Sequence, residues 1–245
     1  MANRLVPFLE NEYYHIYNRG VDKRKTFMNP AEYKRFIRSL VLLNDTAPIA
    51  QTHALRSDIF TRVKLSKEIT KKRTETRGRP VLHPLDKKRD PLVAIGAFAL
   101  MPNHFHLYLT PLVDGGISKM MHRLQTSYTL YFNERHERSG ALFQGTFKAR
   151  HVDSESYARY LFSYIHLNST KLVDPKWKEF GVKDFKRVRD FVRAYPYSSL
   201  PEYLSGKHVI TDPSKFPDFL STMRDVDEHI DMWLQTSPGE NENYF

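Results

Sequence analysis

Two histidines separated by one residue are the most chemically suggestive feature of the sequence. His104 and His106 follow the turn signal Pro102-Asn103 and lie in an alternating apolar run. Side chains two positions apart on a β-strand point to the same face, so both imidazoles would lie together, with Phe105 on the other face. Two neutral imidazoles on one rigid strand supply half of a metal site. The alternative is a pair of surface histidines with ordinary hydrogen bonds.

A tyrosine and an asparagine form a second pair later in the chain. Tyr164 and Asn168 are four positions apart, and residues at this spacing share one face of a helix. A phenol and an amide oxygen would then be presented together. The structural alternative is that Tyr164 fills the core beside Leu161 and that Asn168 ends the helix. The residues alone leave both interpretations open.

Periodicity and turn signals predict the elements that must position these residues. An aromatic strand is expected at 13–20, and Asn29-Pro30 is a good helix start, with Asn at the cap and Pro at the first position. The two histidines fall in a hairpin over 91–111. The further expected elements are a helix at 118–135, a strand at 142–152, a helix from 154 to 168, and helices at 179–194 and 214–235.

The order of these elements predicts the fold class. Strand, helix, strand, strand, helix, strand is the pattern of the ferredoxin-like split βαβ fold. We therefore expect an α+β protein with a four-stranded antiparallel sheet, helices on one face and a C-terminal helical extension. The core would span 1–178, with an exposed basic insertion at about 45–90 that lacks periodicity. The extension and an acidic tail would span 179–245.

The charge of the chain favours a polyanionic partner. The net charge is +10, and residues 61–90 carry eleven Lys or Arg against four acidic residues. There is no cysteine, which excludes disulfides and thiolate metal sites. No apolar run is long enough to cross a membrane, and the start does not read as a signal peptide. We therefore expect a cytoplasmic, nucleoid-associated protein without membrane contact.

The two pairs of residues also occur together in a known family. Residues 101–107 (MPNHFHL), followed by 164–168 (YIHLN), resemble the single-tyrosine HUH transposases, most closely the REP-associated tyrosine transposases. Three more segments resemble that family in the same order: 14–20, 140–148 with Phe143 in place of the usual Trp, and 195–199. Two features depart from the pattern. Ser169 follows the motif asparagine where Pro is common, and the 45–90 segment is longer and more basic.

The resemblance implies a fold, a reaction and a set of site residues. His104, His106 and Asn168 would bind Mg²⁺ or Mn²⁺, and Tyr164 would be the nucleophile. The reaction would be metal-dependent cleavage and transfer of single-stranded DNA, of REP hairpin type, through a 5′-phosphotyrosine. Two alternatives remain: a domesticated hairpin-binding protein without transposition, and a metal-dependent phosphodiesterase that uses water.

The expected partner is single-stranded DNA with hairpin structure, bound by a monomer, with a dimer left open. A basic groove with stacking surfaces is typical of single-strand binding. For each basic residue the alternative is a solvated surface charge. The candidate DNA contacts are Arg19, Lys23, Arg24, Lys25, Arg77, Arg79, Lys148 and Arg150.

Overall fold

The computed structural model describes residues 7–47, 89–222 and 226–235. Its centre is a four-stranded sheet in the order β2-β3-β1-β4, in which every neighbouring pair is antiparallel. This is the strand order of the ferredoxin-like split βαβ fold, so the predicted α+β class is confirmed. The strands are β1 (Tyr13–Arg19), β2 (Val93–Met101), β3 (His104–Pro111) and β4 (Lys148–Val152).

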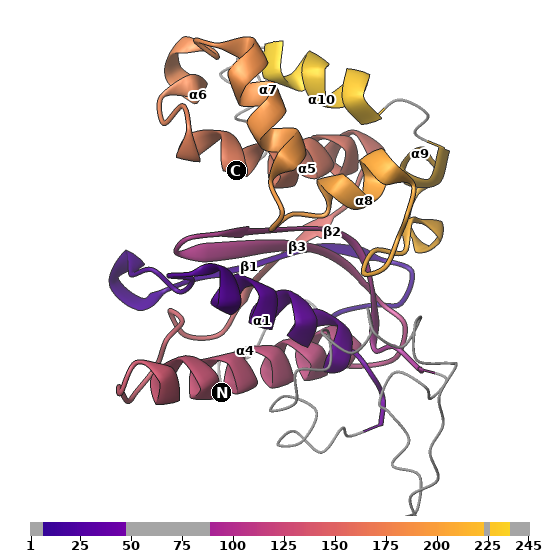
Figure 1. Ribbon diagram of the computed structural model, residues 1–245. Coiled ribbons are helices and arrows are strands. Elements are labelled where there is room, and N and C mark those ends of the chain that lie inside the picture. The colour runs from indigo at the N-terminus through magenta and orange to yellow at the C-terminus, as the bar shows by residue number, and fades with distance from the viewer. Residues whose placement is uncertain (1–6, 48–88, 223–225, 236–245) are drawn as a thin grey trace, which may run out of the picture.

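Two helices, α1 (Pro30–Leu42) and α4 (Gly116–Arg135), lie on one face of the sheet (Figure 1). α1 begins where the sequence predicts, because the side chain of Asn29 accepts hydrogen bonds from two backbone N–H groups of the first turn. The layer between these helices and the sheet is an aromatic and aliphatic core. In it the rings of Phe36 from α1 and Phe105 from β3 have centroids 5.1 Å apart.

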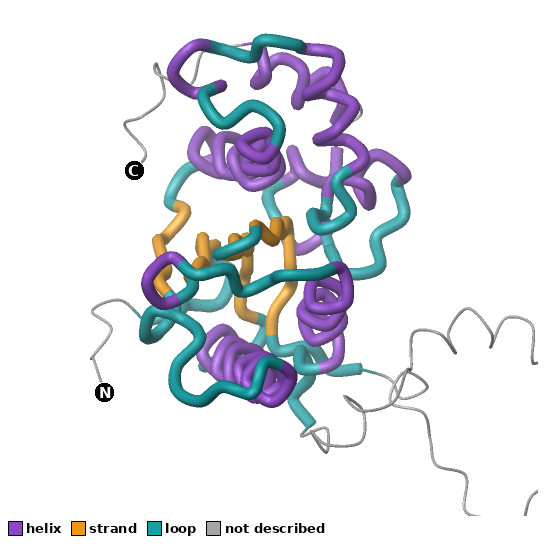
Figure 2. The backbone as a smooth tube through the Cα atoms, turned by 60° about the vertical axis from the view of Figure 1, so that its left-hand side comes forward, coloured by secondary structure: helices purple, strands orange, loops and turns teal. Residues whose placement is uncertain are grey.

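Helices also cover the opposite face of the sheet. The prediction of helices on one face therefore holds for α1 and α4 only. α5 (Glu155–Leu167) contacts both β2 and β3 there, and the strands lie between two helical layers (Figure 2). Every residue of β2 is buried, and an apolar strand of this kind needs cover on both sides. Ala97 and Ala99 turn small side chains to this second face, which lets α5 lie close to the sheet.

Two elements differ in extent from their predictions. The strand expected at 142–152 is shortened to β4, because residues 142–147 run irregularly through Gly145 at a φ of +66°. The helix expected at 214–235 is interrupted at Pro217, which has no N–H to continue a helix. After α5 the chain forms η2 (Asn168–Leu172), α6 (Trp177–Phe180), α7 (Phe185–Ala194), α8 (Leu200–Ser205), η3 (Pro213–Lys215), α9 (Asp218–Thr222) and α10 (Val226–Gln235).

The described ends of the predicted basic insertion lie side by side. The backbone N–H of Thr46 donates to the carbonyl of Asp90 over 2.8 Å. The guanidinium of Arg89 lies 3.7 Å from the carboxylate of Asp45. Residues 48–88, with the candidate DNA contacts Arg77 and Arg79, lie outside the described residues. In the part of the chain that the structure describes, no helix has the length and apolar character to cross a membrane.

Candidate active site

The two histidines of β3 lie on the face that α5 covers. β3 alternates, so Phe105 and Leu107 enter the core beneath α1 and α4. His104 and His106 point to the other side, with ring centroids 5.0 Å apart. The predicted alternation is therefore present, and both imidazoles face the same helix.

Hydrogen bonds fix the orientation of both imidazole rings. Nδ1 of His104 donates to Oδ1 of Asn103 over 2.7 Å, because an amide oxygen only accepts. This leaves Nε2 of His104 as the ring nitrogen with a free lone pair. Nδ1 of His106 lies 2.8 Å from Nε2 of His15 on β1, a buried contact between two imidazoles. A histidine that ligates a metal commonly donates its second nitrogen to a neighbour in this way.

Both rings are held in the neutral form that metal binding requires. Burial, together with the positive charges of Lys171 and Arg19, lowers the pKa of His104 to about 4. Burial and the neighbouring His15 lower the pKa of His106 well below its ordinary value. A neutral imidazole keeps a lone pair for a cation, whereas an imidazolium has none.

α5 places the tyrosine and the asparagine beside these histidines. The ring of Tyr164 packs edge-on against His106, with centroids 5.3 Å apart. Asn168 is one helical turn further on, and its Nδ2 donates to the backbone carbonyl of Tyr164 over 2.8 Å. Oδ1 of Asn168 is buried and has no hydrogen-bond partner among the described residues. A buried amide oxygen without a partner is costly, which makes it a natural position for a cation.

The donor set is suited to a divalent ion. Among the described residues, no group of three or more His, Asp or Glu is placed to hold a metal, so the candidate consists of His104, His106 and the amide oxygen of Asn168. Imidazoles with one oxygen are a comfortable set for Mn²⁺, whereas Mg²⁺ prefers oxygens throughout. The residues present therefore fit a divalent cation, with Mn²⁺ the better chemical match.

The phenol of Tyr164 is a protonated group at neutral pH. Burial raises its pKa above the ordinary value of a tyrosine, and a hydrogen bond from the Asn168 side chain opposes that increase. The ammonium of Lys178 on α6 lies 5.1 Å from the centroid of the Tyr164 ring.

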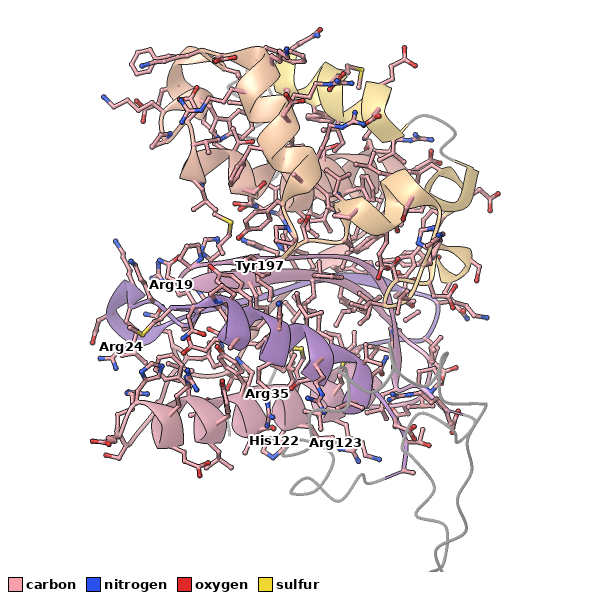
Figure 3. The ribbon with its side chains drawn as sticks, in the orientation of Figure 1. Arg19, Arg24, Arg35, His122, Arg123 and Tyr197 are labelled. Carbon is pink, nitrogen blue, oxygen red and sulfur yellow. The ribbon has the colours of Figure 1, made fainter. Side chains whose placement is uncertain are left out.

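The predicted basic residues at the end of β1 and in the loop after it lie at the same end of the sheet as the histidines. Arg19 is the strand partner of His104, and its Nε donates to Oε1 of Gln144 over 2.6 Å. The backbone carbonyl of Lys23 accepts from Nδ2 of Asn103 over 3.3 Å, which ties the basic loop to the β2–β3 turn. Figure 3 shows Arg19 and Arg24 together at this end. Lys25 follows in the same loop and is exposed.

The predicted basic residues of β4 lie further along the edge of the sheet. Lys148 is paired with Tyr17, and Arg150 is paired with His15. The guanidinium of Arg150 lies 5.1 Å from the centroid of the Tyr157 ring on α5. The described basic candidates therefore border the face that α5 covers in two places, at the histidine end of the sheet and along the β4 edge.

Three residues at the site were not identified from the sequence. His15 bonds His106 only because β1 pairs with β3 in one register, with His15 opposite Tyr108. The only local signal was that His15 lies two positions from Tyr13 and Tyr17, on one face of a strand. Lys171 and Lys178 lie in two short helices after α5, η2 and α6, which are too short to give a periodic pattern in the sequence.

Replacing His15 by alanine is expected to lower the affinity for Mn²⁺ by about 10- to 100-fold, the usual cost of losing a residue that orients a ligand. The reason is that His106 loses the partner of its Nδ1. Calorimetric titration of the protein with Mn²⁺ measures the change. His15→Gln keeps a side-chain acceptor and should retain most of the affinity. Equal affinity for His15→Ala and the unmodified chain would show that His15 has no such role.

Known proteins provide two points of similarity. Residues 51–168 match the family model described as "Transposase IS200 like". The solved "Structure of the REP associates tyrosine transposase bound to a REP hairpin" is similar, with a TM-score of 0.47 and 14% identity over 86% of this chain and 91% of that chain. No curated protein matches the chain.

Proposed function

Because residues 51–168 match the IS200-like transposase family model, we propose that this protein cleaves and rejoins single-stranded DNA with Tyr164 as its nucleophile. The observation that carries the proposal is the meeting of two distant segments. Tyr164 of α5 packs against His106 of β3, with ring centroids 5.3 Å apart, and Asn168 follows at the end of α5. Both pairs fall inside the matched segment.

The nucleophile acts through its phenol oxygen. Oη of Tyr164 attacks the phosphorus of a phosphodiester, and the bond from phosphorus to the 3′ oxygen breaks. The phenol gives up its proton, and the leaving 3′ oxygen gains one. The products are a 5′-phosphotyrosine and a free 3′-hydroxyl. The phosphotyrosine keeps the energy of the broken bond, so a second 3′-hydroxyl can attack it and rejoin the strand.

Three side chains are proposed to hold a divalent ion next to that phenol. Nε2 of His104, the imidazole of His106 and the buried Oδ1 of Asn168 would be its protein ligands. When bound, the ion would polarise the phosphate and stabilise the developing negative charge. His15 and Asn103 keep the two imidazoles in the tautomer and orientation that leave a lone pair available.

The basic residues around this site are proposed to hold the DNA backbone. Arg19 lies opposite His104 at the end of β1, and Lys23, Arg24 and Lys25 follow it in the next loop. Lys148 and Arg150 lie along the β4 edge of the sheet. Hairpin-bearing single-stranded DNA is the proposed substrate, because a hairpin presents unpaired strand beside a stem.

Covalent trapping tests the proposed reaction. The protein is incubated with hairpin-bearing single strands and Mn²⁺ or Mg²⁺, and the products are separated on a denaturing gel. The expected product is a protein–DNA adduct that is absent when EDTA removes the metal. Cleavage without an adduct would identify a phosphodiesterase that uses water. Hairpin binding without any cleavage would identify a DNA-binding protein that does not transpose.

A further inference from the structure

The segment 171–180, which follows the proposed ligand Asn168, borders the active site. Lys171 is in the same 3₁₀-helical turn as Asn168, where residues three apart lie above one another. Lys178 places its ammonium 5.1 Å from the Tyr164 ring centroid. The charges of both lysines act on His106. Two cations therefore lie beside the proposed active site.

Buried residues and backbone hydrogen bonds hold the segment 171–180 in place. Thr170 is fully buried, and its carbonyl accepts the backbone N–H of Asp174 over 2.8 Å. The buried carboxylate of Asp174 accepts the N–H of Lys183 over 3.0 Å. Trp177 is only 4% exposed and anchors the short helix α6. The outward side chains of this segment therefore have a fixed base.

An exposed aromatic ring lies at the end of the same segment. Phe180 is 69% exposed, although it follows the buried Trp177 in a single helical turn. The ammonium of Lys176 lies 5.7 Å from the centroid of the Phe180 ring. An exposed ring on a fixed turn, with basic side chains around it, is the combination that binds unpaired bases and their phosphates.

We propose that the segment 171–180 is a binding surface for the single strand that flanks the scissile phosphate. Lys171 and Lys178 contact successive phosphates next to that phosphate, and Phe180 stacks on an unpaired base further along the strand. The proposal rests on the proposed function, because the position of the scissile phosphate is defined by Tyr164 as the nucleophile. A lone exposed phenylalanine is ordinary on a protein surface, so the test has to show that the ring contacts a base.

Equilibrium binding in EDTA separates this surface from the chemistry. The probes are a fluorescent synthetic DNA hairpin with unpaired flanks of mixed sequence, and the same hairpin without flanks. The double variant Lys171→Gln, Lys178→Gln should bind the flanked probe about tenfold more weakly. Its slope of log affinity against log salt should fall by about 1.4, since each single-strand phosphate contact contributes about 0.7. Lys207→Gln, an exposed lysine after α8, is the matched control and should change neither value.

A second pair of variants tests stacking. Phe180→Ala should weaken binding of the flanked probe by about 5- to 100-fold, the range for one stacked base. Phe180→Trp should restore it, because indole also stacks. Val209→Ala removes an apolar side chain that is 75% exposed and should have no effect. When the flanks of the probe are abasic, the unmodified protein should bind it only as tightly as Phe180→Ala does. The affinity of Phe180→Ala itself should be the same for abasic and normal flanks.

Two outcomes would overturn the proposal. One is unchanged affinity of the lysine and phenylalanine variants for the flanked probe. The other is an equal loss for the probe without flanks, which would assign the segment to the hairpin stem. Neither outcome concerns covalent chemistry, which the trapping experiment measures separately, so failure of this surface and failure of the proposed function are distinguishable.

Discussion

Replacing Tyr164 by phenylalanine should abolish the covalent protein–DNA adduct and reduce strand cleavage by on the order of 10⁴-fold or more, the scale on which enzymes lose activity when their nucleophile is removed. The substitution deletes one oxygen and keeps the ring that packs against His106. The fold and the DNA affinity should therefore be preserved. Denaturing gels with radiolabelled DNA, and binding measured in EDTA, provide the two readouts.

The matched control for this prediction lies one turn earlier on the same helix. Tyr160 stacks on Tyr164 with ring centroids 6.0 Å apart, but it is only 9% exposed. Tyr160→Phe should leave adduct formation within a few fold of the unmodified protein. If Tyr164→Phe still forms the adduct and Tyr160→Phe does not, the nucleophile has been assigned to the wrong tyrosine. If neither substitution matters, neither tyrosine is the nucleophile.

Loss of His106 should have the second largest effect. His106→Ala removes a proposed metal ligand and leaves Nε2 of His15 without its buried partner. A bound metal contributes several kcal/mol to stabilising a phosphoryl transition state, so cleavage should fall on the order of 10³-fold. Affinity for Mn²⁺ should fall as well, and the electron paramagnetic resonance signal of free Mn²⁺ measures it without any activity assay.

His122→Ala is the control for the histidine prediction. His122 is exposed on α4, across the sheet from the site, and Figure 3 shows it in the lower helical layer. Its removal should change neither Mn²⁺ binding nor cleavage. Thermal unfolding without metal shows whether His106→Ala still folds, and His104→Ala provides a second variant, since His104 is less deeply buried. Unchanged Mn²⁺ binding by folded His106→Ala and His104→Ala would refute the ligand assignment.

The sequence was sufficient to predict the four strands of the sheet and the helices that begin with clear caps. The alternation around Phe105 and the Asn29-Pro30 start are local signals, and local signals determine strands and helix starts. The helical cover on the second face was not predicted. This cover is seen in the burial of β2 on both sides. When most residues of a strand are apolar, periodicity cannot distinguish a strand covered on one face from a strand covered on two.

Prediction of the site had a similar limit. Two spacings, His104 to His106 and Tyr164 to Asn168, are local and could be read directly. The contact of His15 with His106 depends on strand register, which a sequence specifies only through the finished sheet. The position of Lys178 depends on the single helical turn of α6, which the buried Trp177 anchors. Long-range contacts of this kind carry no signal in a single sequence.

The two edges of the sheet also determine how copies of this protein can meet. Residues 197–199 already bond the free edge of β2, through the N–H of Leu100 to Tyr197 and the N–H of Ser199 to Phe98. The opposite edge, β4, is short and carries Lys148 and Arg150 on its exposed side. Short, basic edges discourage strand addition, because pairing would bring like charges together. The β2 edge is thus paired with the protein's own backbone, and the β4 edge carries positive charges that disfavour pairing with a second copy. A neighbouring copy would therefore have to associate through a helical surface and not by extending the sheet.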